Sequence, residues 1–170
     1  MIIQLGTFEV TSGKVVVTDP CYELGKEAIF MGTLDHVLNG TWYGEVEKTE
    51  VNHWGEVCAK LLAFHSSFRD PHDASLWTRC DFMVSVDSGQ AGVFDISKYR
   101  VPDTGTEAAD PAADSDWYLA CCDITEEGEE AGVIDGGVVS RSGMGDGGYK
   151  AFVALNEDRQ VIGVKIVFIQ

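Results

Sequence analysis

Basic residues are scarce in this 170-residue chain. It has 12 lysines and arginines against 28 aspartates and glutamates, which gives a formal net charge of −16 at pH 7. Binding to nucleic acid needs clustered cations that displace counterions from phosphates, so we expect no direct nucleic-acid ligand. The acidity serves either solubility or the docking of a basic protein partner, DNA mimicry included.

Long apolar runs are absent as well. No stretch approaches the roughly 18 residues that a bilayer-spanning helix needs. Residues 1–10 have neither the basic region nor the small-residue cleavage site of a secretory signal. We therefore expect a cytoplasmic protein with no membrane partner. With 45% hydrophobic residues the chain can build a sizeable core, and its length predicts a single domain over residues 1–170.

Paired metal-binding and disulfide motifs are also missing. The histidines show no His-x-x-x-His or His-Glu-x-x-His spacing, which excludes a zinc protease, and only His65 is a candidate for acid or base work. A structural histidine at a strand end is its commoner role. An odd, irregularly spaced set of five cysteines argues against a disulfide framework and structural zinc: Cys21, Cys58, Cys80, Cys121 and Cys122.

What the chain does contain is a series of short β-rich segments separated by Gly, Asn and Asp turns. Hairpins are predicted from residues 3–10 with 14–18, from 41–48 with 57–65, and from 149–155 with 161–169. Residues 82–87 and 131–140 predict further strands. A short helix is predicted over 33–38. The fold class is therefore mainly β, with α+β as the alternative, built as an antiparallel β-sandwich or open barrel with one or two short helices.

The excess negative charge is concentrated in the second half of the chain. Residues 101–140 contain eleven acidic residues and no lysine or arginine. The Pro, Gly, Ala and Asp content of residues 102–116 predicts an exposed, mobile loop. Residues 117–124 are apolar enough to pack on the core, as a helical turn capped by Ser115 or Asp116.

Three loops that follow strands are candidates for a site. The first contains Asp19 and Cys21, for which we consider catalytic roles. Asp19 either closes a turn by accepting backbone hydrogen bonds, as an aspartate before proline often does, or acts as a base or metal ligand. Cys21 would be a nucleophile only with a lowered pKa and a nearby base, which the sequence does not locate.

The second loop offers oxygen ligands around two glycines. Asp87, Ser88, Gln90 and Asp95 are candidate ligand-binding residues, and such oxygens suit Mg²⁺ or Ca²⁺. The spacing does not match an EF-hand. The alternative is a bulged connection between strands in which Asp87 and Asp95 satisfy turn amides.

The third loop has four glycines in six residues before a strand. Its candidate ligand-binding residues are Ser142, Gly145, Gly147 and Tyr149, and Asp146 is a candidate catalytic residue. Successive glycine amides can form a nest for a small anion such as a nucleotide phosphate. The segment lacks a Walker motif, and a tight turn capped by Asp146 is the alternative.

The motifs Gly-x-Val-x-Val-x-Asp-Pro-Cys-Tyr, over residues 13–22, and Gly-Asp-Gly-x-Tyr, over residues 145–149, resemble those of a set of uncharacterised bacterial and bacteriophage proteins. The chain departs from that set at Lys150, where a proline is frequent, and at Asp158-Arg159, in place of an Asp-Gly turn. The resemblance implies a small, mainly β fold and a phage or mobile-element origin, and it transfers no catalytic residue. Because mobile elements often encode acidic inhibitors of host enzymes, it favours an interaction protein.

Two functions are compatible with these observations. The first is a non-enzymatic protein-binding or inhibitor module that presents its acidic segment or loops to a protein partner and needs no cofactor. The alternative is a hydrolase or small-ligand-binding protein in which Asp19, Asp87, Asp95 and Asp146 converge, with or without Mg²⁺ or Ca²⁺ and with help from Cys21 or His65. The alternative requires that the three loops share one rim.

Overall fold

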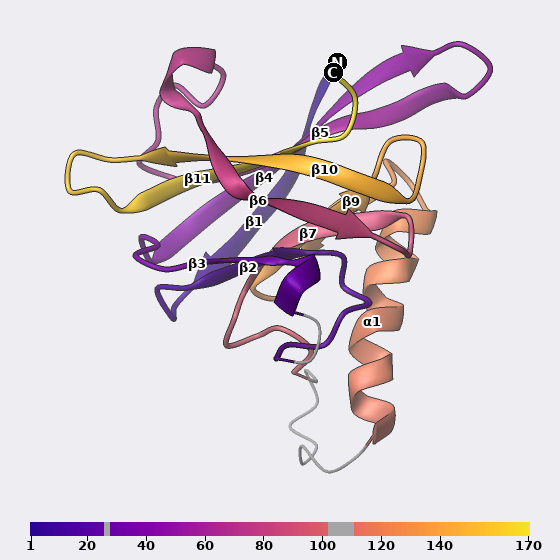
Figure 1. Cartoon of the computed structure of the whole chain (residues 1–170), viewed down its shortest axis with the longest axis horizontal. Helices are drawn as coiled ribbons and strands as arrows, with labels where there is room; N and C mark the ends of the chain where they lie inside the picture. Colours follow the sequence, from indigo (N-terminus) through magenta and orange to yellow (C-terminus); the bar gives the residue numbers. More distant parts are fainter. Residues whose placement is uncertain (26–27, 102–110) are drawn as a thin grey trace.

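The chain folds as two antiparallel β-sheets that pack face to face, with one α-helix among the described residues (Figure 1). The computed structural model describes residues 1–25, 28–101 and 111–170. The six-stranded sheet runs, in spatial order, through β1 (Ile2–Val10), β4 (Gly40–Val51), β5 (Gly55–His65), β11 (Val161–Val167), β10 (Gly147–Leu155) and β6 (Thr78–Val86). The five-stranded sheet runs through β3 (Gly32–Leu34), β2 (Val15–Thr18), β7 (Gln90–Asp95), β9 (Gly137–Arg141) and β8 (Ala131–Ile134).

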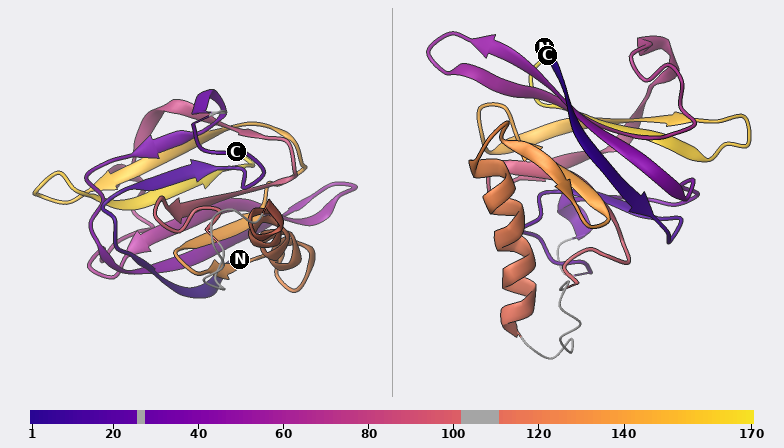
Figure 2. Two further views of the ribbon diagram at one scale, coloured as in Figure 1. Left: turned by 90° about the horizontal axis from the view of Figure 1, so that it is seen from below. Right: turned by 180° about the vertical axis from the view of Figure 1, so that it is seen from behind.

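Neither sheet closes on itself, so the fold is a β-sandwich, as predicted, and not a barrel. The helix α1 (Pro111–Glu126) contacts β8 and β9, and so covers the outer face of the five-stranded sheet (Figure 2). Two short 3₁₀ helices, Ala28–Phe30 and Ala74–Leu76, lie in connections. None of the helices that the structure describes has the length and apolar character needed to cross a bilayer.

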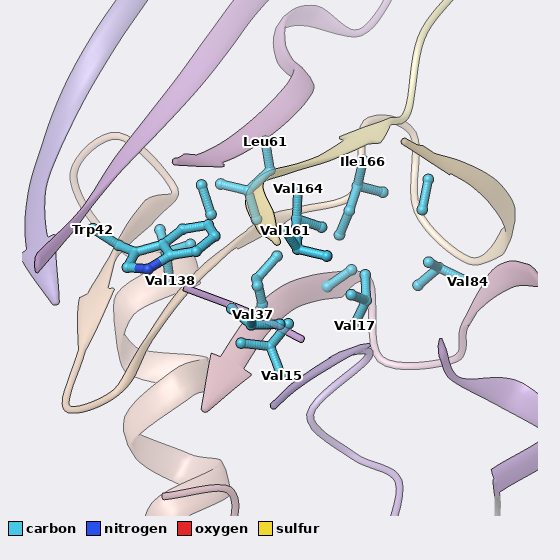
Figure 3. Close-up of a cluster of buried hydrophobic side chains, with 14 of the residues drawn as sticks. Val15, Val17, Val37, Trp42, Leu61, Val84, Val138, Val161, Val164 and Ile166 are labelled. Carbon is cyan, nitrogen blue, oxygen red and sulfur yellow. The ribbon is translucent and has the colours of Figure 1, made fainter. Parts of the chain in front are cut away.

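The main core fills the space between the two sheets (Figure 3). Trp42, Leu61 and Ile166 of the six-stranded sheet pack against Val15 and Val17 of β2, and all five are fully buried. Strands of a sandwich alternate inward and outward residues, so one face of each strand reaches this layer. Each buried side chain of this size contributes about 1.5–3 kcal/mol by leaving water.

A second cluster lies between the five-stranded sheet and α1. Val16, Phe94 and Val139 point away from the main core and pack with Trp117 and Cys121 of the helix. Consequently β2 is buried on both faces, which explains its unbroken run of β-branched residues. A third cluster lies on the opposite, outer face of the six-stranded sheet and includes two side chains of the connection 66–77: Leu62, Phe64, Phe68, Trp77, Ala154 and Ile162.

Two of the predicted hairpins are confirmed. Strands β4 and β5 pair antiparallel with Val51 opposite Gly55, and strands β10 and β11 pair around a turn in which the Arg159 amide donates to the Asn156 carbonyl at 3.0 Å. The strand predicted over residues 82–87 is also present within β6. In it Val84 and Val86 are buried while Met83 is exposed, as the alternation requires.

The predicted hairpin of residues 3–10 with 14–18 is wrong. Strand β1 pairs with β4, whereas β2 pairs with β3 and β7 in the other sheet. The physical reason is burial, because β2 needs apolar cover on both faces. Strand β1 has only half-buried and exposed residues up to Phe8, and it forms an edge of the six-stranded sheet.

The predicted helix over residues 33–38 is also wrong, because residues 32–34 form β3 and pair with Val15, Val16 and Val17. Pairing with a buried strand overrides the local helix preference here. A Cβ at Gly32 would lie 2.0 Å from the Phe82 ring, so only glycine fits this approach.

The helical turn predicted over 117–124 belongs to a longer helix. Because α1 begins at Pro111, which suits the first helical position, the proposed cap at Ser115 or Asp116 is wrong. The two parts of the acidic loop predicted over 102–116 therefore have different outcomes. Residues 102–110 lie outside the described residues, and 111–116 belong to the helix.

Candidate functional site

The three candidate loops meet at one end of the five-stranded sheet. Strands β2 and β9 both flank β7 antiparallel, so the end of β2, the start of β7 and the end of β9 lie at the same rim. The Asp87 amide donates to the Asp19 carboxylate at 2.8 Å, and the Gly89 amide donates to the Asp146 carboxylate at 2.9 Å. The Ser142 amide donates to the Gly89 carbonyl at 3.0 Å. The loops thus share a rim, as the ligand-binding alternative requires.

Asp19 is fully buried at the centre of this rim. Its Oδ1 accepts the Cys21 amide at 2.8 Å and the Ser88 hydroxyl at 2.5 Å. Its Oδ2 accepts the amides of Asp87 at 2.8 Å and Ser88 at 2.6 Å. A carboxylate has about four acceptor positions, so protein donors occupy all of them. This geometry supports the turn-closing role and leaves no lone pair for a metal or a substrate proton.

Cys21 is half-buried beside Asp19. Burial, followed by the negative charges of Asp19 and Asp87, raises the pKa of its thiol to about 12. The thiolate is the nucleophilic form, so a thiol with this pKa is unreactive at neutral pH. The neighbouring Tyr22 donates its hydroxyl to Asp87, and burial followed by this hydrogen bond also raises the pKa of Tyr22.

Gln90 is buried and faces α1, not the solvent. Its amide nitrogen donates to Cys122 Sγ at 3.3 Å, and its amide oxygen accepts the Thr125 hydroxyl at 3.2 Å. The side chain therefore fixes the helix on strand β7. Cys121, fully buried next to this contact, has a pKa raised to about 12 by burial and fills core space, as a small apolar residue does.

The glycine-rich loop forms a tight turn. The Gly145 amide donates to the Ser142 carbonyl at 3.1 Å, and the Ser142 hydroxyl donates to the Gly145 carbonyl at 2.8 Å. Tyr149 donates its hydroxyl to the same two carbonyls, at 3.1 and 2.5 Å. Gly145 has φ +119° and Gly147 has φ +158°, so side-chain residues fit poorly at Gly145 in particular. The Gly145 amide is thus used within the turn, which does not support an anion nest there.

Asp95 does not join the other aspartates, so the expected convergence of four carboxylates is wrong. It lies at the far end of β7, roughly 17 Å along the strand from Gln90. Its carboxylate accepts the Thr11 amide at 2.7 Å and the Ser97 amide at 2.9 Å, and it also accepts the Ser12 hydroxyl at 2.5 Å. Burial opposes ionisation, but these hydrogen bonds outweigh it and lower the pKa of Asp95.

No metal cluster is formed by the described residues: nowhere among them do three or more His, Cys, Asp or Glu side chains gather in a metal-binding arrangement. Asp87 and Asp146 are exposed at the rim but hold loop contacts of their own. His65 has the structural role expected at a strand end. Its ring nitrogens lie 2.8 Å from the Ser67 hydroxyl and 3.0 Å from the Asn39 carbonyl.

The outer face of α1 carries several exposed acidic side chains, and residue-type motifs do not reveal it. Trp117, Cys121 and Thr125 face inward. The opposite side is an exposed stripe, which we call the acidic stripe: Asp116, Leu119, Ala120, Asp123, Glu126 and Glu127. The spacing of three or four residues places the members within α1 on one helix face, and Glu127 follows directly after the helix. This helical spacing of acidic residues is the sequence pattern from which the stripe could have been predicted.

In the part of the chain that the structure describes, the four carboxylates of the acidic stripe form no ion pair. Two cations of the described chain pair with other carboxylates: Arg141 lies 3.5 Å from Glu130, and Lys98 lies 3.4 Å from Asp135. Mutual repulsion of carboxylates on adjacent turns costs a few tenths of a kcal/mol per pair. A basic partner would relieve this repulsion.

Comparison with protein-family models, with curated proteins and with solved structures gave no match to this chain.

Proposed function

We propose that the protein is a non-enzymatic binding module that presents the acidic stripe of α1 to a basic protein partner. The observation that carries the proposal is the stripe itself. Three carboxylates of α1 and that of Glu127, directly after the helix, are exposed, and none of the four forms an ion pair among the described residues. Opposite charges on a partner would speed association and select it over other proteins. Inhibition of a basic host enzyme, as the phage resemblance implies, is one form of such binding.

Leu119 supports a protein partner over a purely ionic one. Its side chain is 54% exposed between Asp116 and Asp123, where a surface helix needs no leucine. A charged rim around an apolar anchor is the usual composition of a protein interface, whose centre loses water on binding. An amphipathic helix can dock such an anchor in a groove of its partner.

The hydrogen bonds of the rim support a binding role over a catalytic one. Asp19, the best-placed carboxylate, is saturated by donors of the protein, and the Cys21 thiol has its pKa raised to about 12. A hydrolase needs an activated nucleophile and a base within hydrogen-bond reach of it. These residues hold the loops together and so position α1 for binding.

A charge-neutralised variant tests the proposal. Asp116→Asn, Asp123→Asn and Glu126→Gln remove three charges of the acidic stripe. The matched control, Asp35→Asn, Glu157→Gln and Asp158→Asn, removes three exposed charges from two distant loops. Each immobilised protein is incubated at low salt with an extract of cells from its native host. We expect wild type and control to retain the same basic protein and the stripe variant to lose it.

Salt dependence and direct binding complete the test. Binding of the purified partner should weaken markedly from 50 to about 300 mM salt, because exposed charges are screened beyond the Debye length. Leu119→Ser should bind the partner more weakly than wild type does at each salt concentration, with the same dependence on salt. The proposal fails if no partner is retained at low salt, or if the stripe variant retains it as well as wild type does.

A further inference from the structure

A groove with basic walls lies on the outer face of the six-stranded sheet, on the side of the sandwich that α1 does not cover. Its volume is about 500 Å³, which is within the usual range for small-ligand sites. Five strands contribute to it, β4, β5, β11, β10 and β6, together with the residues after β11. Its lining is Glu47, Thr49, Ala59, Lys60, Arg79, Lys150, Phe152, Val167, Ile169 and Gln170.

Strand register explains how these residues come together. Glu47 is opposite Lys60, Lys60 is opposite Val167, and Val167 is opposite Lys150, so one row of side chains crosses four strands. Residues in register on adjacent strands point to the same face of a sheet. Lys60 and Lys150 are two strands apart, roughly 10 Å between backbones. The row therefore places one ammonium group, of Lys60 or of Lys150, on each side of the apolar Val167.

The cations of the groove are only partly neutralised. Lys60 lies 3.4 Å from Glu47, and Glu47 is the acidic side chain of the groove lining. Arg79 makes a weak contact with Met83 Sδ at 3.6 Å, and Lys150 has no carboxylate partner among the residues that the structure describes. In a chain with 28 acidic residues, this concentration of cations is a local reversal of charge.

Aromatic rings and a further lysine border the same face. The Lys165 ammonium lies 4.6 Å from the centre of the Trp77 ring and 5.2 Å from that of Phe152. These contacts hold the Phe152 ring in place beside the groove. Burial, followed by the nearby charge of Lys60, lowers the pKa of Lys165. An anion in the groove would offset this repulsion between lysines.

We propose that this groove binds a small amphipathic anion, namely an organic phosphate or carboxylate that carries an apolar group. Its anionic group lies between Arg79 and Lys150, where a guanidinium fork can donate two parallel hydrogen bonds and an ammonium adds a point charge. Its apolar group lies on Phe152, Val167 and Ile169. A concave site with an apolar floor and a few convergent polar groups is the usual architecture for such ligands.

Three probes separate the two parts of this ligand. Phenyl phosphate, benzoate and inorganic phosphate are titrated into the full chain by isothermal calorimetry and by amide chemical-shift mapping. We expect at least one aromatic anion to bind at least tenfold more tightly than inorganic phosphate, because only the aromatic probes reach the apolar floor. The shifted amides should belong to β5, β6, β10 and β11. Phenyl phosphate above benzoate indicates a phosphate ligand, and the reverse order indicates a carboxylate.

Matched variants locate the site. Arg79→Gln with Lys150→Gln should reduce binding of the preferred probe at least tenfold. Lys98→Gln with Arg159→Gln removes two exposed cations away from the groove and should leave binding unchanged. The shift mapping on wild type does not depend on the folding of either variant. The proposal is overturned if no aromatic anion binds at millimolar concentration, if inorganic phosphate binds as tightly, or if the shifted amides lie elsewhere. It is independent of the acidic stripe.

Discussion

Asp19 and Ser88 are joined by two hydrogen bonds, one from the Ser88 amide to Asp19 Oδ2 at 2.6 Å and one from the Ser88 hydroxyl to Asp19 Oδ1 at 2.5 Å. The two residues are 69 positions apart in the chain. Ser88 belongs to the turn that carries the chain from the six-stranded sheet into the five-stranded sheet. The pair therefore fixes the sheets relative to each other at the rim.

Replacement of Asp19 by asparagine should destabilise the fold. The carboxylate accepts from three backbone amides, and an asparagine would turn an NH₂ group toward at least one of them. A buried amide left without an acceptor costs about 1–3 kcal/mol, so we expect a loss on the order of 3 kcal/mol in the free energy of unfolding. Urea denaturation followed by circular dichroism measures it. The exposed Asp158→Asn, as control, should change stability by less than about 0.5 kcal/mol.

The role of Asp19 shows what the sequence can and cannot predict about the rim. An aspartate before proline predicts a local turn, and its bond to the Cys21 amide confirms that role. The bonds to Asp87 and Ser88 come from a loop far along the chain, and no local pattern records them. For the same reason, the position of Asp95 at the opposite end of β7 follows only from strand topology.

The fold, too, was predictable from the sequence only in part. Hairpins with short turns were predictable because adjacent strands pair around a turn whose residues are visible, as at Asn156. Strand β1 finds its partner about 40 residues later, which depends on burial across the whole sandwich. The helix α1 was shortened in the prediction because its first turns are acidic and rich in alanine. Pro111 marks its beginning, and the acidic stripe follows from its period.

Cys21 should react slowly with alkylating reagents. With a pKa near 12, only about one thiol in ten thousand is ionised at pH 8, whereas an unperturbed cysteine is substantially ionised. We expect carbamidomethylation of Cys21 by iodoacetamide to be at least roughly a hundredfold slower in the native protein than in urea. Mass spectrometry of the peptide that contains Cys21 measures both rates. Equal rates would contradict the raised pKa and reopen a nucleophilic role.

Asp95 should make stability depend on acidity. Its folded pKa lies below the ordinary value of about 3.9, so the native state binds fewer protons than the unfolded state in acid. The stabilisation is fully present above the unfolded pKa and is lost as the pH falls through the folded pKa. We expect Asp95→Asn to be about 2–3 kcal/mol less stable than wild type at pH 7. The difference should shrink between roughly pH 4 and pH 2.

Urea titrations of both proteins across pH 2–7 provide this measurement. The other carboxylates titrate in the same range, so the informative quantity is the difference between wild type and variant at each pH. Asp146→Asn is the matched control, because this exposed carboxylate accepts one amide. A difference between wild type and Asp95→Asn that is constant with pH would rule out a lowered pKa for Asp95.

His72 should stabilise a buried carboxylate on the outer face of the six-stranded sheet. The Glu45 side chain is 4% exposed, and its Oε1 accepts a hydrogen bond from Gln4. Its Oε2 has no hydrogen bond in the described part of the chain, but it lies 3.0 Å from His72 Nε2. With His72→Ala we expect a loss of about 1–3 kcal/mol in the free energy of unfolding, because that oxygen stays buried without compensation.

A double-mutant cycle separates this effect from a general loss of packing. Glu45→Gln removes the carboxylate that His72 faces, so His72→Ala should cost much less in that background, and the coupling energy should exceed about 0.5 kcal/mol. Thermal and urea denaturation of the four proteins provide the values. Arg69→Ala is a suitable control, since this exposed side chain of the same connection forms no hydrogen bond or ion pair among the described residues. If the two substitutions are additive, the proximity of His72 does not stabilise Glu45.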